Sequence, residues 1–564
     1  MKKEPQVIDF FCGAGGFSEG FRQQGFHIVM GIDNWLPAIE THNLNHNLND
    51  PIKNVLDFES IEEINRLPNT EVIVGSPPCV LFSLSNKGGK ADKSFGIKLI
   101  ESFLRVIAVK KHQPSSKLVA WFMENVPNSK NYIRQSYTFS QLKLGKWAKE
   151  HGYDPNEIAL SGSANGRTLN TAHFGAAQKR ERFLCGEIIA TGAFPDLAKF
   201  VGTSYRSIGE VRGGMPKPNS ALSNITYADP NYPSLKCKMN LITDHFYDSG
   251  IYENQWKKAR DLKLNHPYMG KMSFPEEEGG PSRTIMATRS FSSRESLIYK
   301  SEYARSGDGE YRLPTIRELA TLMGFPYSYQ FSGSEGTKWR QVGNAVCPPM
   351  SSALAKSVRL DMGLEIIPDS QITFEPPENK IEKIQNLNTF TTMVFGNPPQ
   401  RKPNARFRGH PFKGGNMTIA LTNYNPVKPS DSEILNEWYS TVFLGTGQDF
   451  VAKIIPKNHF KSIGKLIEIH HKDIGRRFIK EFERSFSDVI GNSHKFQEAY
   501  VFEDTRLPHE PSRLIDKIGK FILEFELELE PELEQMKMPD LIPEKPHVPT
   551  RQVFAMYAIN RIVS

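Results

Sequence analysis

Short apolar runs alternate with polar, turn-forming segments through the first third of the chain. The runs are Val7 to Phe11, Ile28 to Ile32, Val72 to Val74 and Val119 to Met123, and they are followed by cysteine, aspartate, glycine and glutamate, respectively. Runs of this length between turn residues are typical of buried parallel strands, with helices connecting them. The pattern therefore predicts a doubly wound α/β core over residues 1–188.

A glycine-rich turn follows the first predicted strand, at Gly13, Gly15 and Gly16. Glycines in such a turn let the backbone approach a ligand closely. The second strand ends at Asp33, about twenty residues further on, where a carboxylate suits ribose hydroxyls. Asp57 ends a weaker segment and is a candidate contact for an adenine amine. For either aspartate the alternative is a helix cap or a turn. Together the features predict a nucleoside site.

A cysteine and a glutamate stand directly past the third and fourth predicted strands. Cys79 follows Pro77 and Pro78, and Glu124 follows Met123. Ligands of open α/β sheets bind at the carboxyl ends of the strands, so both side chains are expected in the crevice. The alternative for Cys79 is a small buried hydrophobe, and for Glu124 a surface salt bridge. Burial would favour a neutral Glu124, able to donate a proton to a ring nitrogen.

Two further segments carry candidate chemistry. Gln178, Arg180 and Arg182 alternate, so on a strand they would share one face, suited to phosphate or a polar base edge. An ordinary solvated face is the alternative. Residues 340–349 form a loop before a predicted amphipathic helix from Met350 to Val358.

Length and composition narrow the class of protein. The chain has 564 residues, which predicts two to four domains. A net charge of +7 permits a nucleic-acid partner without establishing one. The five cysteines are scattered, so we expect neither a disulfide framework nor a metal site. No run of about eighteen apolar residues and no signal-peptide core are present, which predicts a cytoplasmic protein with no membrane partner.

Six segments, in this order, resemble motifs of the cytosine-5 DNA methyltransferase family, and they span roughly residues 6–360. They are Phe11 to Gly16, Pro78 to Ser83, Glu124 to Val126, Gln178 to Arg182, Pro314 to Pro326 and Gln341 to Val346. The resemblance implies a Rossmann-like methyltransferase core, a smaller target-recognition domain, and the activity of a DNA (cytosine-5)-methyltransferase.

The resemblance also implies roles for individual residues. Cys79 would attack C6 of a cytosine flipped out of double-stranded DNA, and Glu124 would contact N3. Arg182 would support the activated base beside Arg180, Pro78 would shape the loop, and Asn344 would organise it. The methyl donor would be S-adenosylmethionine, with no metal required. Its expected binding residues are Phe11, Gly13, Gly15, Gly16, Asp33, Asp57 and Pro78. Residues 85–96 are expected to form a mobile lid over DNA.

The same resemblance divides the chain. Residues 1–188 and 336–362 would form the catalytic domain, residues 189–335 the target-recognition domain, and 363–385 a linker. Basic residues of the recognition domain are expected to contact phosphates: Arg206, Arg212, Lys217, Lys236 and Lys238. Residues 386–564 would be an accessory α/β or α+β domain of unknown role, beyond the resemblance. Within it, Arg401 to Arg408 is a basic patch with an aromatic residue, suited to nucleic acid or to solvent.

The leading hypothesis is an enzyme that marks host or mobile-element DNA or protects it from a separate cognate endonuclease, as in restriction-modification. One alternative is a tRNA cytosine-5 methyltransferase, although the Cys-Phe-Thr tripeptide of that branch is absent. A second alternative is a catalytically silent DNA-binding regulator. The presence of the catalytic residues of the family argues against it: Cys79, Glu124, Arg182 and Asn344. A methyltransferase fused to a nuclease is a third. Adjacent His470 and His471 invite that interpretation, but on a strand they would point to opposite faces.

Overall fold

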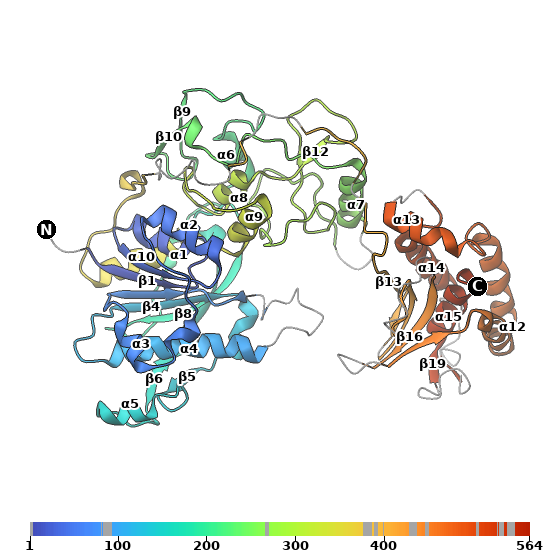
Figure 1. Ribbon diagram of the computed structural model, residues 1–564, viewed down its shortest axis with the longest axis horizontal. Coiled ribbons are helices and arrows are strands. Elements are labelled where there is room, and N and C mark those ends of the chain that lie inside the picture. The colour runs from blue at the N-terminus through green and yellow to red at the C-terminus, as the bar shows by residue number, and fades with distance from the viewer. Residues whose placement is uncertain are drawn as a thin grey trace. The chain divides into compact units, whose positions relative to one another are not determined.

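The computed structural model divides the chain into two compact units, residues 1–395 and 396–564 (Figure 1). Each unit has its own buried apolar core. The structure describes residues 4–79, 82, 93–265, 270–375, 386–388, 393–398, 400–414, 416–427, 437–445, 451–502, 507–526, 528, 535–537 and 547–564.

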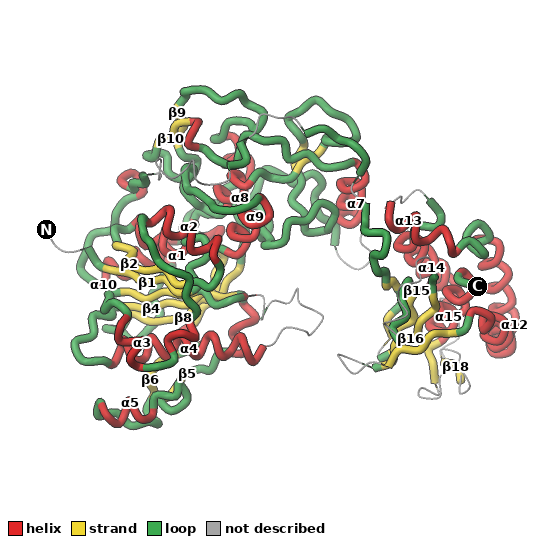
Figure 2. The backbone as a smooth tube through the Cα atoms, in the orientation of Figure 1, coloured by secondary structure: helices red, strands yellow, loops and turns green. Residues whose placement is uncertain are grey.

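A six-stranded sheet forms the centre of the first unit, with the order β2-β1-β3-β4-β8-β7. Its strands are β1 (Gln6–Phe10), β2 (His27–Ile32), β3 (Val72–Gly75), β4 (Ala120–Asn125), β7 (Gly166–Asn170) and β8 (Glu181–Ile188). The first four are parallel, and β8 runs antiparallel to both of its neighbours. The predicted parallel strands and the α/β class are confirmed, and the sheet is mixed at β8. The strands lie side by side in one layer in Figure 2.

Alternate side chains of each strand enter two separate cores. Val7 and Val72 pack with α1 (Gly16–Gln23) and α10 (Pro348–Asp361). Ile8 and Ile73 pack on the other face, with α4 (Lys93–His112). Period-two alternation explains how one short apolar run serves both faces. The result is a three-layer arrangement, with helices on either side of the sheet (Figure 1).

Two glycines let α10 close against the glycine-rich turn. A Cβ on Gly16 would lie 2.0 Å from the carbonyl oxygen of Val346, and one on Gly20 would lie 2.6 Å from that of Pro348. Neither distance is sterically allowed, so the returning helix requires glycine at both positions. The predicted helix over 350–358 is confirmed and begins earlier, at Pro348, where the fixed φ of proline suits a first helical turn.

The remaining helices of the first core are short. They are α2 (Leu36–His46), α3 (Ile61–Arg66), α5 (Gly145–Glu150) and α9 (Glu335–Asn344), and β5 (Ser136–Thr138) pairs with β6 (Ile158–Ser161) beside the main sheet. The predicted lid lies mostly outside the described residues. Its last four positions, 93–96, form the first turn of α4.

The predicted recognition region consists mostly of loops. Its elements are α6 (Ile208–Gly213), β9 (Thr226–Ala228), β10 (Lys236–Lys238), α7 (Glu253–Leu264), β11 (Tyr299–Lys300), β12 (Tyr311–Arg312) and α8 (Ile316–Leu322). Lys217, Lys236 and Lys238 are exposed, as a phosphate contact requires. Ion pairs and hydrogen bonds, more than secondary structure, hold these loops together.

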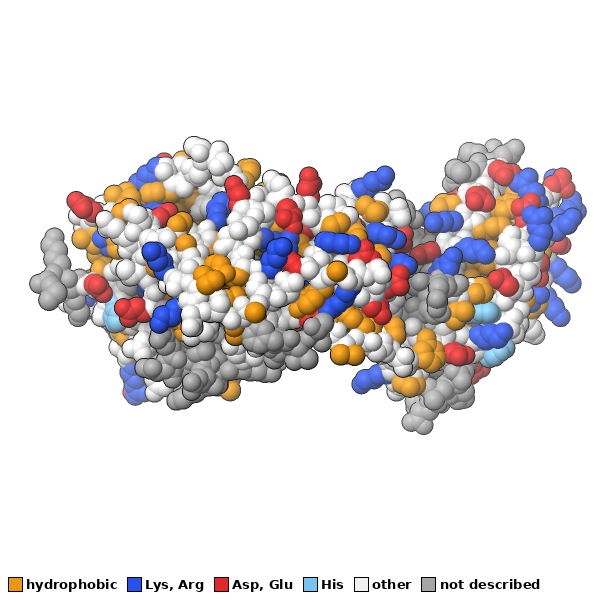
Figure 3. All heavy atoms as spheres, turned by 90° about the horizontal axis from the view of Figure 1, so that it is seen from above, with side chains coloured by type: hydrophobic (Ala, Val, Ile, Leu, Met, Phe, Trp, Pro, Cys, Tyr) orange, Lys and Arg blue, Asp and Glu red, His pale blue; other side chains and the backbone are white. Residues whose placement is uncertain are grey.

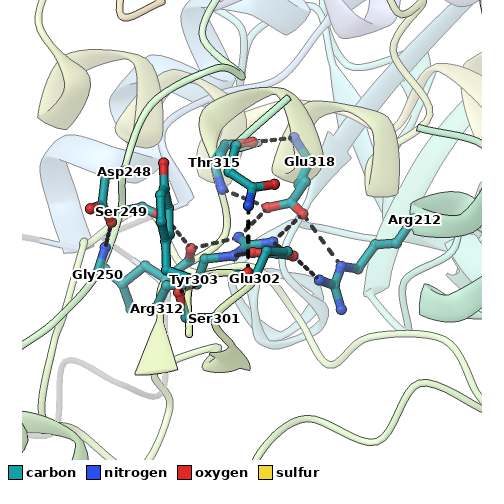
Figure 4. A network of polar contacts seen from close by, with 12 residues as sticks. Arg212, Asp248, Ser249, Gly250, Ser301, Glu302, Tyr303, Arg312, Thr315 and Glu318 are labelled. Atoms are coloured by element: carbon teal, nitrogen blue, oxygen red, sulfur yellow. Dashed lines mark hydrogen bonds and ion pairs between the residues drawn. The ribbon is translucent and has the colours of Figure 1, made fainter. Parts of the chain in front are cut away.

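A buried ion-pair network connects the loops to α8 (Figure 4). Arg312 donates to both carboxylate oxygens of Glu318, at 2.7 and 2.8 Å, and Arg212 pairs with Glu302 at 2.8 Å. Burial would raise the pKa of Glu318, but Arg312 and Arg212 hold it well below its usual range. Arg206 is likewise engaged, donating to the carbonyl of Pro230 at 2.7 Å. The prediction of phosphate contacts by Arg206 and Arg212 is therefore not supported, because the protein occupies both guanidinium groups.

The chain after α10 does not form a free linker where it is described. Phe374 stacks on Tyr329 with ring centroids 5.7 Å apart. Further along, the side chain of Asn388 accepts hydrogen bonds from the backbone N–H groups of His245 and Phe246. Residues 386–388 and 393–395 thus belong to the first unit, and the second unit begins at Gly396 rather than at the expected residue 386.

The second unit is an antiparallel sheet packed against helices, an α+β arrangement. Its strands are β13 (Arg408–Gly409), β14 (Lys413–Gly414), β15 (Met417–Thr422), β16 (Tyr439–Leu444) and β17 (Val451–Ile455), with a separate pair β18 (Gln535–Lys537) and β19 (His547–Pro549). Its helices are α12 (Phe460–Ser485), α13 (Phe496–Phe502), α14 (Pro511–Glu526) and α15 (Thr550–Ile562). Helix α15 is buried along most of its length, as its near-continuous apolar sequence requires.

The segment with the paired histidines is helical. His470 and His471 lie in α12, just before a kink at Lys472, so the argument from opposite faces of a strand was wrong. His471 is buried and His470 is exposed. Within the described parts of the chain, His, Cys, Asp and Glu side chains form no group of three or more that could hold a metal ion. Over the same residues, no helix is both long and apolar enough to cross a membrane.

Candidate active site and cofactor pocket

A pocket opens at the carboxyl ends of β1, β2 and β3. Three of the predicted cofactor residues, Phe11, Asp33 and Pro78, contribute to its wall. Its remaining lining is Ile32, Asn34, Lys53, Asn54, Val55, Phe95 and Leu99. The wall is largely apolar and carries one carboxylate, Asp33, and one lysine, Lys53, a composition that suits a nucleoside.

The Asp33 carboxylate is held by the backbone at the rim of this pocket. The N–H of Gly13 donates to one of its oxygens at 3.0 Å, and the N–H of Trp35 donates to the other at 2.9 Å. Burial raises the pKa of Asp33, while these backbone bonds and the charge of Arg340 oppose the shift. Each carboxylate oxygen has a second lone pair, so the group can still accept a bond from a ligand hydroxyl.

The glycines of the turn are not part of the pocket lining, and the backbone conformation of the turn requires them. Gly13 and Gly15 have φ of 53° and 86°, in the left-handed region that favours glycine. A Cβ on Gly15 would also lie 2.6 Å from the hydroxyl of Tyr329. That hydroxyl donates to the carbonyl of Ala14 at 2.6 Å and so supports the turn from behind. Sequence reasoning missed Tyr329, because nothing local marks a residue that acts across more than 300 positions.

Asp57 caps a short helical turn, which the sequence offered as the alternative to an adenine contact. Its carboxylate accepts the N–H of Asn54 at 2.7 Å, in a capping box that begins the short helical turn η1 (Val55–Phe58), and the residue is exposed. Asn54 and Val55 line the pocket, while Asp57 is not part of its lining. The geometry does not support the predicted adenine contact by the Asp57 side chain.

The loop that carries Cys79 is anchored at several points past the end of β3. The N–H of Ser76 donates to the carbonyl of Phe10 at 3.1 Å. The Asn125 amide donates to the carbonyl of Pro77 at 3.0 Å, and the N–H of Phe82 donates to that of Cys79 at 3.0 Å. These bonds hold a partly exposed thiol immediately beside Pro78, which itself lines the pocket.

Glu124 and Arg182 meet as an ion pair at the same edge of the sheet. Nε of Arg182 lies 2.9 Å from Oε1 of Glu124, and the two side chains are only 9% and 5% exposed. Ser76 donates its hydroxyl to the other carboxylate oxygen at 3.0 Å. Sequence reasoning foresaw a neutral carboxyl in an apolar pocket; the structure instead supplies a charged partner and a hydroxyl donor. Ser76 was missed, although it stands just before Pro77-Pro78.

The other predicted catalytic residues lie behind this centre. Arg180 is buried and donates to the carbonyls of Gly343, at 2.8 Å, and Ile285, at 3.1 Å, so it ties the end of α9 to the recognition region. Gln178 accepts the N–H of Ile285 at 2.8 Å. Asn344 is exposed at the end of α9. Strand β8 begins only at Glu181, so Gln178 and Arg180 lie outside the strand that the predicted alternation assumed.

Electrostatics leave the thiol of Cys79 protonated at neutral pH. Burial raises its pKa, the charge of Arg182 lowers it, and that of Glu124 raises it again, with a net upward shift. Thiolate, not thiol, is the nucleophile, so further activation must accompany substrate binding.

Alkylation of Cys79 by iodoacetamide is therefore expected to accelerate with pH through and beyond pH 9 in the DNA-free protein. The other four cysteines are buried, so the modified peptide can be followed by mass spectrometry. Arg182→Gln removes a neighbouring positive charge and should slow the reaction at every pH below the plateau. A plateau reached near pH 7 would contradict this assignment.

One family model and several known proteins are similar to this chain. A family model described as C-5 cytosine-specific DNA methylase matches residues 5–359. Type II methyltransferase M1.HphI of Haemophilus parahaemolyticus is 29% identical over 381 residues, which cover 62% of this chain and 86% of that protein. M.HgiDI of Herpetosiphon aurantiacus is 27% identical over 361 residues, covering 63% and 94%. A solved structure of a Spodoptera frugiperda DNMT2 mutant aligns with a TM-score of 0.40 and 16% identity, over 63% of this chain and 99% of that one. The second unit lies outside the family match.

Proposed function

Since this chain belongs to the C-5 cytosine-specific DNA methylase family, we propose that it methylates C5 of a cytosine within a specific sequence of double-stranded DNA, through a covalent bond to Cys79. One observation carries the proposal. Glu124 and Arg182 are ion-paired at the sheet edge where Cys79 emerges, and the residue before Cys79 lines the nucleoside-type pocket.

The pocket suits S-adenosylmethionine, a nucleoside without a phosphate. The Asp33 carboxylate would accept hydrogen bonds from the ribose hydroxyls. Phe11, Val55 and Leu99 would contact the apolar faces of the ligand. When bound, S-adenosylmethionine supplies an electrophilic methyl group. Pro78 would set the distance between this pocket and the neighbouring thiol.

The protein's own groups account for activation of the base. The Cys79 thiolate adds to C6, and the electron pair of the C5–C6 double bond moves onto C5, which becomes the nucleophile. A protonated Glu124 donates to N3 and transfers its proton there as the thiolate adds, so the negative charge that reaches the ring is neutralised. Once C5 carries the methyl group, a water molecule takes the C5 proton, the electron pair of that bond re-forms the C5–C6 double bond, and the S–C6 bond breaks to return the thiolate. Arg182 and Ser76 hold the Glu124 carboxylate in place throughout.

This chemistry needs the cytosine outside the duplex, because C6 is stacked and inaccessible within it. The loops around α6 and α7, with exposed Lys217, Lys236 and Lys238, would contact the backbone of the DNA. The relatives named above are type II methyltransferases, which supports the inference of a modification enzyme that protects DNA from a cognate endonuclease.

Transfer of tritium-labelled methyl groups tests this function. We expect label in duplex DNA at one recurring sequence, with the modified cytosine resistant to bisulfite conversion. Label in tRNA with none in duplex DNA would favour the tRNA enzyme, and the absence of transfer to either would favour a silent regulator.

Asp33→Asn is expected to weaken S-adenosylmethionine binding by about 10- to 100-fold, the effect of losing a charged hydrogen-bond acceptor. Isothermal titration calorimetry measures the change. Asp57→Asn is the matched control, since Asp57 caps η1 and does not line the pocket. Its affinity should stay within about threefold of wild type, and equal losses in the two variants would remove Asp33 from the binding site.

A further inference from the structure

The start of the second unit is basic and contains no acidic residue. Between positions 396 and 427 there are five Lys and Arg residues and no Asp or Glu. They are Arg401, Lys402, Arg406, Arg408 and Lys413. In the space-filling view, Lys and Arg side chains are prominent on the visible face of this unit, at the right (Figure 3). A local excess of one charge on an otherwise balanced unit points to a polyanionic partner.

Strand register places two of these residues on one side of the sheet. Arg408 pairs with Thr422 and Lys413 with Thr418, two positions on the same face of β15. Ile419 lies on the opposite face of β15, and it belongs to the core that the sheet shares with the helices. Successive side chains of a strand point to opposite faces, so Arg408 and Lys413 point away from the helical layer.

Aromatic rings support the arginine head groups on this side. The guanidinium of Arg408 lies 3.6 Å from the ring centroid of Phe443, and that of Arg406 lies 5.3 Å from the centroid of Tyr424. Arg406, Arg408 and Lys413 are nevertheless exposed. Stacking on the ring of Tyr424 restrains the guanidinium of Arg406, and a planar guanidinium suits bidentate contact with phosphate.

The charges also converge around His410. Burial lowers the pKa of His410, and the nearby charges of Arg408 and Lys413 lower it further. His410 itself is exposed, and it stands between Arg408 and Lys413 in the chain. Such a concentration of like charge is costly in isolation and is relieved when an anion binds.

We propose that this basic edge, defined as Lys402, Arg406, Arg408 and Lys413, binds the phosphate backbone of duplex DNA as a second contact outside the catalytic unit. The proposal rests on the function above only in taking the enzyme's own DNA substrate as the polyanion. Phosphate contacts add affinity and position but read no sequence. The edge would therefore increase binding to target and non-target duplexes alike.

A short connection makes this second contact effective. Phe395 packs against Tyr252 of the first unit, with ring centroids 5.1 Å apart. In the second unit the N–H of Arg401 donates to the carbonyl of Val501 at 2.9 Å. Only residues 396–400 join these two points. DNA held by either unit is consequently presented to the other at high effective concentration.

The test uses the full-length protein and two charge-matched triple variants. The first, Lys402→Gln with Arg406→Gln and Lys413→Gln, removes charge from the basic edge. The second, Lys461→Gln with Lys465→Gln and Lys480→Gln, removes the same charge from exposed positions of α12. Fluorescence anisotropy over a series of KCl concentrations gives the Kd for a duplex with the target sequence and for one without it.

The basic-edge variant is expected to bind both duplexes about tenfold more weakly at low salt, and its plot of log K against log[KCl] should lose a slope of roughly 2 to 3. The α12 variant should match wild type. Equal weakening in both triple variants, unchanged affinity in the first, or stronger competition by single-stranded RNA than by duplex DNA would each overturn the proposal. Methyl transfer at saturating DNA should be the same for all three proteins, so a wild-type protein without transfer would contradict the proposed function and not this inference.

Discussion

Cys79→Ala is expected to reduce methyl transfer to duplex DNA by roughly 10⁴-fold or more, the scale seen when an enzyme loses its nucleophile. Without the sulfur no bond to C6 can form, and C5 of cytosine is then too weak a nucleophile to accept a methyl group. Binding of S-adenosylmethionine should persist, because the Asp33 carboxylate and the apolar wall of the pocket are unchanged.

Single-turnover transfer of tritium measures the loss, and calorimetry confirms that the cofactor still binds. Cys237→Ala is the control, since Cys237 is a buried cysteine on β10 within the recognition region. A duplex carrying 5-fluorocytosine at the target should trap the wild-type protein as an adduct stable to denaturation, and Cys79→Ala should form none. Appreciable turnover by Cys79→Ala, or an adduct on another residue, would refute the covalent role.

Glu124→Gln is expected to slow the single-turnover rate by about 10²- to 10⁴-fold while changing DNA affinity little. The amide keeps the size of the carboxyl group and can still bond to Ser76, but it cannot carry the charge or the proton that activation of N3 requires. It also leaves the guanidinium of Arg182, which is only 9% exposed, without its ion-pair partner.

Because breaking a buried ion pair is itself destabilising, thermal unfolding must be recorded for this variant. A double-mutant cycle with Arg182→Gln separates catalysis from stability. If Arg182 acts by holding Glu124, the rate losses will be strongly non-additive, and Arg182→Gln will add little to Glu124→Gln. A wild-type rate for Glu124→Gln would exclude Glu124 from the mechanism, whatever its effect on the unfolding temperature.

The parallel strands and the positions of Cys79, Asp33 and Glu124 followed from local sequence. A strand covered by helices on both faces must be apolar throughout, so it appears as a short continuous run that ends abruptly. Parallel strands bring their carboxyl ends to one edge, which places residues just past those ends near each other even when they are far apart in sequence. The order of six family motifs then indicated the chemistry.

The local sequence did not predict the contacts of polar side chains whose partners are distant in the chain. Arg212 has the same local character as an exposed phosphate-binding residue, yet Glu302 and Glu318 engage it in a buried network. Asp57 could have faced an adenine or capped a turn, and the Asn54 backbone determined the outcome. The helix that holds His470 and His471 looked like a strand because its apolar positions fit both periods.

What the amino-acid order determined alone was therefore the set of buried strands, the turns that end them and the reactive residues at those ends, since each depends on neighbours in the chain. Tertiary structure alone decided which charges pair. It paired Arg182 with Glu124, bonded Arg180 to the end of α9, and placed residues 386–388 and 393–395 against the rest of the first unit. The physical reason is that an ion pair or a buried hydrogen bond depends on distance in space and burial, and neither is encoded in local periodicity.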